Sequence, residues 1–433
     1  MIGMPRISIH HLQVALLAVT AAAGIGGCGS RQPAPKMAAA RAERTEAATA
    51  TEPSLPVTVE EGEKFARDLI AAVGSADVAS LNELIAWDAI VKKASEDVDA
   101  SQKFNKEFLQ GVKEGATKRC GEAFFATVQG GGYFRPLHIH EVDGRKSALF
   151  RVLLGTGELT YYDMPLGRRS DGKIVALDFY GFASGEFISQ LMRRGVVQAV
   201  AEHNRGLLAR IAGSGNEQER ALLIMARISD AQKAGKHQQA FQLYGTLPAS
   251  FKKGKMAQMA HLAITQSLDE QQYLAAMDEY QSLYPDDPGV DLISIDYFIL
   301  RKRYDKALVC VDRLDTMVDD PYLEAVRASI HLADGKSDLA TEAADRAIER
   351  EPDEPRCYWV RVEISLKEKK FADTVRMLEL LRTQLKIQLD DLSQQGAYAE
   401  FVQSPEYDAW MKSRAPIAAP SCPDKLRTAA DKR

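Results

Sequence analysis

The chain is poor in the residues that mark several classes of protein. Five cysteines in 433 residues are too few for a fold held together by a disulfide framework. Lys+Arg (55) nearly balance Asp+Glu (60), so no strongly basic face for a nucleic acid is indicated. Aromatic residues make up 7% and hydrophobic residues 45%, which is the usage of a globular protein and excludes a mostly disordered or collagen-like chain. The length is enough for about two to three domains.

Sequence motifs of the common catalytic sites are missing as well. The chain has no P-loop, no Gly-x-Ser-x-Gly and no His-Glu-x-x-His. No Cys-x-x-Cys occurs, so the sequence indicates neither thioredoxin-type chemistry nor a zinc ribbon, both of which use this motif. We therefore expect no cofactor and no metal. Beyond Cys28, four thiols remain whose pairing the spacing does not decide: Cys120, Cys310, Cys357 and Cys422.

The N-terminal segment, up to Cys28, has the pattern of an export signal. Arg6 precedes an apolar run over residues 12–25, which is too short to span a bilayer as a mature helix. The run closes as Ile25-Gly26-Gly27-Cys28, which resembles the lipobox of bacterial lipoproteins. The alternative is an ordinary secretory signal with a chance cysteine.

The lipobox resemblance implies where the protein is held. In that family the signal peptide, here residues 1–27, is cleaved just before the cysteine, which is diacylated. Gly29 stands where an aspartate would often retain a lipoprotein at the inner membrane, so the resemblance implies the outer membrane, facing the periplasm. A multiply acylated anchor is durable. Residues 28–56 are rich in Ala, Pro, Thr and charge and have no aromatic residue, which predicts a disordered tether.

Residues 57–210 read as helices followed by strands. Thr58 and Glu61 form a capping-box pattern, and after residues 130–132, all glycine, the hydrophobic period changes from about 3.6 to 2. Four strands are expected, at 133–142, 146–155, 158–168 and 174–183. Hairpin-type turns join them, so the sheet is expected to be an antiparallel meander, followed by a helix from 185 to about 210. This order is an α+β arrangement.

The order of elements resembles the NTF2-like fold, in which a curved sheet wraps a long helix and leaves a cone-shaped pocket. Some members are lyases or isomerases, and others bind ligands or oligomerise without catalysis. The pocket candidates are His138, His140, Tyr162, Asp178 and Tyr180. In an enzyme, Asp178 would be the base and Tyr180 or Tyr162 the hydrogen-bond donor. In the alternative interpretation the rings are packed and Asp178 only accepts a hydrogen bond from a neighbouring turn.

Residues 216–412 carry an internal repeat. Each copy begins with a small residue followed by larger ones at plus four and plus seven, and the leading residues are Ala240, Ala276, Ala307, Ala340 and Thr374. Their spacing is close to the period of about 34 residues of the tetratricopeptide repeat (TPR), an all-α solenoid, and the array resembles that family. Pro288 and Pro352 close two copies, as proline does in the family. Residues 397–412 look like one or two amphipathic helices that cap the array, and residues 413–433 like a disordered tail.

The TPR resemblance implies a groove for partner peptides along the first helix of each repeat. The positions singled out are His261, Asp296, Tyr322, Ser329, Trp359 and Glu363. The alternative for Tyr322 and Trp359 is packing between repeats. The carboxylate clamp of chaperone-binding TPR domains is missing from these positions.

Together these patterns predict a lipid-anchored envelope scaffold that binds other envelope proteins through its repeats and is not an enzyme. The alternative function is ligand binding or lyase or isomerase activity in the cone pocket. The partners expected are envelope proteins and the membrane, with no nucleic acid. Because NTF2-like sheets often dimerise, a homodimer is compatible with the sequence.

Overall fold

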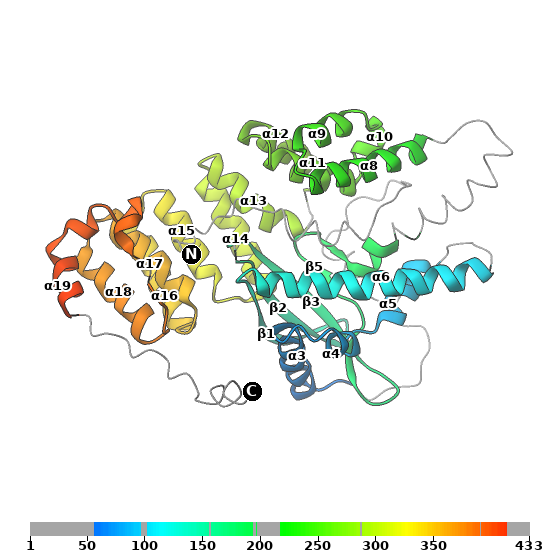
Figure 1. Ribbon diagram of the computed structural model, residues 1–433, viewed down its shortest axis with the longest axis horizontal. Coiled ribbons are helices and arrows are strands. Elements are labelled where there is room, and N and C mark those ends of the chain that lie inside the picture. Colours follow the sequence, from blue (N-terminus) through cyan, green and yellow to red (C-terminus); the bar gives the residue numbers. More distant parts are fainter. Residues whose placement is uncertain are drawn as a thin grey trace, which may run out of the picture.

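The computed structural model describes residues 56–96, 102–155, 157–193, 196, 217–285, 288–389 and 391–413. The predicted signal peptide, the tether up to residue 55, the boundary between the two predicted units and the tail from residue 414 lie outside these ranges. The fold combines a six-stranded antiparallel sheet with many helices, and its C-terminal region is all helical (Figure 1).

Four helices precede the sheet: α3 (Val59–Gly74), α4 (Val78–Glu83), α5 (Trp87–Ser95) and α6 (Gln102–Gln129). The predicted capping box begins α3, because the Glu61 amide donates to Thr58 Oγ1 at 3.2 Å and the Thr58 amide donates to Glu61 Oε2 at 3.0 Å. Asp77 caps α4 in the same way, accepting from the Ser80 amide at 3.0 Å. Local sequence therefore determines where α3 and α4 begin.

The strands are β1 (Tyr133–Val142), β2 (Arg145–Leu153), β3 (Leu159–Arg168), β4 (Ile174–Ala176), β5 (Tyr180–Gly181) and β6 (Glu186–Phe187). Their order is β1-β2-β3-β5-β6, with β4 paired to the far end of β3. The β1–β2 turn has positive φ at both Asp143 (52°) and Gly144 (73°), as a two-residue hairpin requires.

Two expectations for this region are corrected. The strand expected at 174–183 is broken, because the chain leaves β4 after Ala176 and pairs again only at Tyr180. The helix expected from Gly185 begins at residue 188, because Glu186 and Phe187 first pair with β5. Most of its expected length lies outside the described residues.

Both faces of the sheet are buried. One face carries Phe150, Val152 and Met164 and packs with α3 and α6 in one apolar cluster. The alternate residues Leu149, Leu153 and Tyr161 point to the opposite face, where they join an apolar cluster with the C-terminal helices. All of β2 from Ser147 to Leu153 is buried, as expected for a strand covered on both sides.

The C-terminal region consists of helical hairpins. The first and second helices of the five pairs are α8 (Glu217–Lys233) with α9 (His237–Gly245), α11 (Lys255–Gln266) with α12 (Glu270–Leu283), α13 (Pro288–Leu300) with α14 (Tyr304–Val318), α15 (Leu323–Ala333) with α16 (Ser337–Arg350), and α17 (Pro355–Lys367) with α18 (Phe371–Thr383). A short helix, α10 (Ala249–Lys252), precedes the second pair. The five leading small residues all lie on second helices and are at most 1% exposed. The repeat period therefore marks a position that is buried in every one of the five hairpins.

An Arg–Asp ion pair between neighbouring helices occurs at two equivalent places in this region. Arg327 on α15 pairs with Asp312 of α14 at 2.9 Å, and Arg361 on α17 pairs with Asp345 of α16 at 3.0 Å. The two arginines occupy equivalent positions of successive hairpins, and their side chains are 14% and 6% exposed. These pairs connect the third hairpin to the fourth and the fourth to the fifth.

The end of the array is covered as expected, but by shorter elements. Three 3₁₀ turns (Leu392–Gln394, Gly396–Tyr398 and Phe401–Gln403) and α19 (Pro405–Ser413) replace the one or two expected helices. Phe401 and Trp410 are buried there with Leu378 of α18.

Candidate functional site

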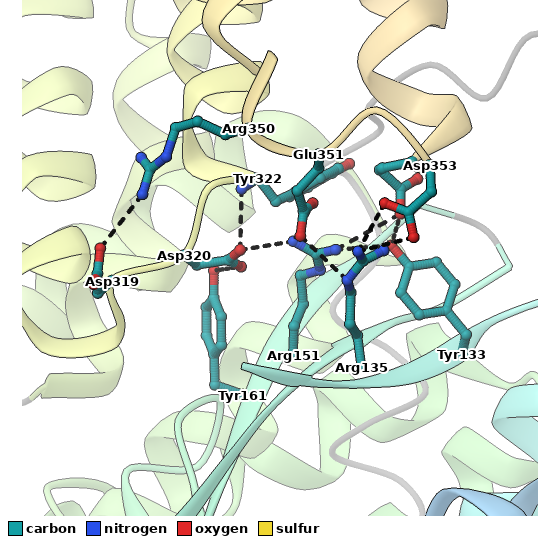
Figure 2. A network of polar contacts seen from close by, with 11 residues as sticks. Tyr133, Arg135, Arg151, Tyr161, Asp319, Asp320, Tyr322, Arg350, Glu351 and Asp353 are labelled. Carbon is teal, nitrogen blue, oxygen red and sulfur yellow. Dashed lines mark hydrogen bonds and ion pairs between the residues drawn. The ribbon is translucent and has the colours of Figure 1, made fainter. Parts of the chain in front are cut away.

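A polar network joins the sheet to the helical hairpins. At its centre is Arg151 of β2, whose side chain has no exposure to solvent. Its Nη1 lies 2.6 Å from Asp320 Oδ1 and 2.9 Å from Glu351 Oε2, and its Nη2 lies 3.6 Å from Glu354 Oε2. A buried guanidinium is tolerated only when carboxylates replace its water, and here three do so (Figure 2).

Two tyrosines of the sheet donate hydrogen bonds to the same carboxylates. Tyr161 of β3 donates to Asp320 Oδ2 at 2.9 Å, and Tyr133 of β1 donates to Glu354. Burial, together with the nearby carboxylates, raises the pKa of both phenols, so they stay neutral donors. The strands β1, β2 and β3 thus each contribute a polar side chain to the contact between the sheet and the hairpins.

A second arginine lies directly beside the first. Arg135 of β1 and Arg151 are cross-strand partners, a like-charge pair that is unfavourable by itself. Glu351 lies between them, with Oε1 at 3.2 Å from Arg135 Nε and Oε2 at 2.9 Å from Arg151 Nη1. Arg135 Nη2 also pairs with Asp353 at 2.8 Å. The sheet therefore presents paired cations and the hairpins present the anions.

The acids occupy equivalent loops between successive hairpins. Asp320 lies between α14 and α15, while Glu351 and Glu354 lie between α16 and α17. Asp320 also accepts from the Tyr322 amide at 3.0 Å and Glu354 from the Arg356 amide at 3.1 Å. Asp320 and Glu354 therefore each satisfy a backbone donor at the start of a first helix and also bind the sheet.

Apolar contacts surround this network. Leu149, Leu153 and Phe182 from the sheet side belong to one buried cluster with Leu292 of α13 and Val326 of α15. The Tyr322 ring lies 4.8 Å from the Arg151 guanidinium carbon. The sheet and the third to fifth hairpins consequently share a single core.

Among the pocket candidates, the two histidines lie on this junction face. His138 is paired across the strands with Leu149, so both point toward the hairpins and not toward α3 and α6. His140 Nε2 lies 3.0 Å from Asp163 Oδ1, which also accepts from Ser147. Burial and His140 lower the pKa of His138. The expectation that they line one pocket with Tyr162 is corrected, because Tyr162 lies on the opposite face.

Asp178 is fully engaged in local contacts. Oδ1 accepts from the Phe179 amide at 3.0 Å and the Ser189 amide at 3.2 Å, and Oδ2 accepts from Ser189 Oγ at 2.5 Å and Lys93 Nζ at 3.2 Å. Burial raises its pKa, against the effect of Lys93. It caps the helix that begins at residue 188 and ties this helix to α5, which matches the alternative interpretation of this residue.

Tyr162 and Tyr180 are separated by the sheet. Tyr162 lies on the helix-covered face, its ring 5.7 Å from Phe124 and 6.0 Å from Phe179. Tyr180 packs on the junction face, 5.4 Å from the Phe182 ring. The structure therefore does not bring Asp178, Tyr162 and Tyr180 together on one strand face, since residues 177–179 lie between two strands.

Two of the groove candidates are buried within the molecule. Tyr322 is 1% exposed beneath Arg151, so its partner is the sheet and not an external chain. Asp296 of α13 is 6% exposed. Its burial, and to a smaller extent the nearby carboxylate of Glu158, raise its pKa well above 3.8. The expectation that these two side chains line an open groove is corrected, because the sheet and its β2–β3 loop cover them.

The other groove candidates keep some exposure. His261 of α11 stacks on Tyr244 with ring centroids 4.2 Å apart and is half-buried. Ser329 of α15 and Trp359 of α17 are half-buried, and Glu363 is exposed one turn after Trp359. Trp359 also packs against the C-terminal cluster, so it is partly a packing residue.

Other site chemistry is limited in the part of the chain that the structure describes. No three His, Cys, Asp or Glu side chains are arranged there to hold a metal ion. None of the described helices is both long and apolar enough to cross a bilayer. Cys120, Cys310 and Cys357 are unpaired, and Cys28 and Cys422 lie outside the described ranges.

The junction residues had a sequence signal that the pattern search did not use. Arg151 is the one charge in the apolar run from Ala148 to Leu154, where both faces of a strand must be buried. Two acids followed by proline recur at 286–288, 319–321 and 353–355, one repeat apart. From these two signals, the lone cation in a buried strand could have been predicted to contact the repeated acidic turns.

Comparisons with known proteins add no relative. No family model, no curated protein and no solved structure matches this chain. Its interpretation therefore depends on the residues themselves.

Removing the central cation tests the junction. Arg151→Ala should lower the free energy of unfolding by about 3–5 kcal/mol, because three buried carboxylates lose their counterion. Arg350→Ala is the matched control, since Arg350 pairs with Asp319 at 3.5 Å with both side chains exposed, and should cost about 0–1 kcal/mol. Urea denaturation measures both, and equal losses would contradict a buried junction.

The buried carboxyl of α13 predicts a pH dependence. Because burial raises the folded-state pKa of Asp296, the protonated form is favoured and stability falls as pH rises through that pKa. Asp296→Asn should therefore be more stable than the wild type at about pH 8, by about 1.4 kcal/mol per unit of raised pKa, and equal to it near pH 4. Thermal unfolding across this range provides the measurement, with the exposed Asp305→Asn as control. A constant difference at all pH values would contradict the assignment.

Proposed function

We propose that this protein is a lipid-anchored, non-catalytic scaffold of a bacterial cell envelope. In this proposal TPR-like hairpins contact other envelope proteins, and an NTF2-like sheet unit braces the hairpins. The observation that carries it is the burial of all five leading small residues, one in each hairpin, which supports a TPR-like array.

The contacts of the sheet support a structural role for the first unit. The hairpins occupy the junction face of the sheet. On the helix-covered face the rings of Phe124, Phe134 and Tyr162 pack together. Asp178, the proposed base of the enzymatic alternative, is committed to Lys93 and to the cap of a helix. These contacts favour the scaffold over catalysis in a cone pocket.

The contacts between the sheet and the hairpins exclude some of the groove candidates from the proposed partner surface. Tyr322 and Asp296 are covered and the His261 ring is stacked on Tyr244. The surface that we assign to partners therefore lies on α15 and α17, at Ser329, Trp359 and Glu363. A half-buried aromatic ring beside an exposed acid suits a partner segment that carries an apolar and a cationic side chain.

A crosslinked pull-down from envelope extracts tests this surface. Glu363→Lys in the full lipidated chain should reduce captured partners about tenfold, because it reverses the charge at the proposed surface. The control, Glu342→Lys, makes the same change on α16, where Glu342 is exposed, and should retain the partners. Equal capture by both variants, or no reproducible partner for the wild type, would overturn the proposal.

The membrane anchor is tested separately. Cys28→Ser should move the protein from the membrane fraction to the soluble fraction and abolish incorporation of labelled palmitate, because the acylated thiol is lost. Cys422→Ser should leave both unchanged. Retention of Cys28→Ser in the membrane would show that something other than an acylated Cys28 holds the chain there.

A further inference from the structure

Two histidines of β1 lie outside the network that joins the sheet to the hairpins. His138 and His140 are two residues apart on the strand, so both side chains lie on the junction face. Their ring centroids are 5.5 Å apart. Both side chains are half-buried, and that of His140 is 27% exposed. Solvent therefore reaches a pair of adjacent imidazoles.

A buried carboxylate fixes the orientation of His140. Asp163 of β3 is 4% exposed, and its Oδ1 lies 3.0 Å from His140 Nε2 and also accepts from Ser147. Because an ionised carboxylate only accepts hydrogen bonds, Nε2 of His140 carries the proton and the lone pair of Nδ1 remains available. A histidine that donates one ring N–H to a carboxylate is the usual arrangement of a metal ligand, whose other nitrogen binds the ion.

The surroundings of His138 suit a bound cation. Among the described residues neither of its ring nitrogens has a hydrogen-bond partner. Burial and His140 lower the pKa of His138, which keeps the imidazole neutral, the form that binds metal ions. The carboxylates of Asp163, Asp319 and Asp320 oppose this effect, so the ring lies near negative charge. A purely structural role explains the bond between His140 and Asp163, but leaves the neighbouring imidazole without a role.

We propose that His138 and His140 bind one divalent transition-metal ion and that Asp163 positions His140 for it. A metal–nitrogen bond is about 2 Å long, so two imidazoles on one tetrahedral ion have ring centroids about 5 Å apart, close to the 5.5 Å here. Zn²⁺, Cu²⁺ and Ni²⁺ take imidazole as a ligand, whereas Mg²⁺ and Ca²⁺ prefer oxygen. No third side chain is in place among the described residues, so water would complete the coordination. The proposal departs from the expectation of no metal, which depended on missing sequence motifs.

Calorimetric titration of the full chain with Zn²⁺ measures the affinity of the site. His138→Ala and His140→Ala should each lower the affinity by more than about tenfold, the smallest loss usual for a residue that only supports a ligand. Both histidines are half-buried, so urea denaturation without metal should show that the variants fold. The control His331→Ala removes a half-buried imidazole from α15 and should leave the affinity unchanged. Wild-type affinity in both β1 variants would overturn the proposal.

Electron paramagnetic resonance with Cu²⁺ identifies the ligands. The wild-type spectrum should show coupling to two imidazole nitrogens, and each alanine variant of β1 should show one. Asp163→Asn should keep both nitrogens but bind Zn²⁺ about 10–100-fold more weakly, because the carboxylate that orients His140 is lost while the ligands remain. A wild-type spectrum without two imidazoles would overturn the site, and unchanged affinity in Asp163→Asn would overturn the positioning role of Asp163.

Discussion

The architecture depends on one guanidinium that has no access to water. Arg151 is held by carboxylates that come from two loops far along the chain, and those loops in turn begin the first helices α15 and α17. Replacing a buried ion pair by apolar residues is often neutral for stability, so its distinctive contribution is orientation. A purely apolar contact between a sheet and a helical array could slide, whereas Arg151 and Asp320 meet in one register only.

This arrangement changes how a repeat array can work. We propose a TPR-like array, and the inner surface of such an array is usually open to partners; in this structure the side of the hairpins that carries Tyr322 is covered by the chain's own sheet. The groove candidates that keep some exposure are distributed over three first helices: His261 on α11, Ser329 on α15, and Trp359 and Glu363 on α17.

Local patterns predicted the elements well, and the contacts between units poorly. The capping box at Thr58, the first three strands and the small leading residues such as Ala340 each depend on neighbours within one element or one hairpin. The fourth strand was wrong because pairing of Tyr180 with Asp163 depends on the sheet and not on alternation along the chain. The sequence left Tyr322 open between a groove position and packing between repeats. Its burial depends on Arg151 of the sheet, and no periodicity within the hairpins carries that information.

The distance between the two units tests the central claim most directly. Spin labels on non-natural side chains at Arg145, the exposed first residue of β2, and at Glu349, on the exposed side of α16, would report how the sheet lies against the hairpins. Pulsed electron resonance should give one narrow distance distribution in the wild type, because the junction fixes a single arrangement. A broad distribution would mean that the sheet and the hairpins move independently, which would contradict the account.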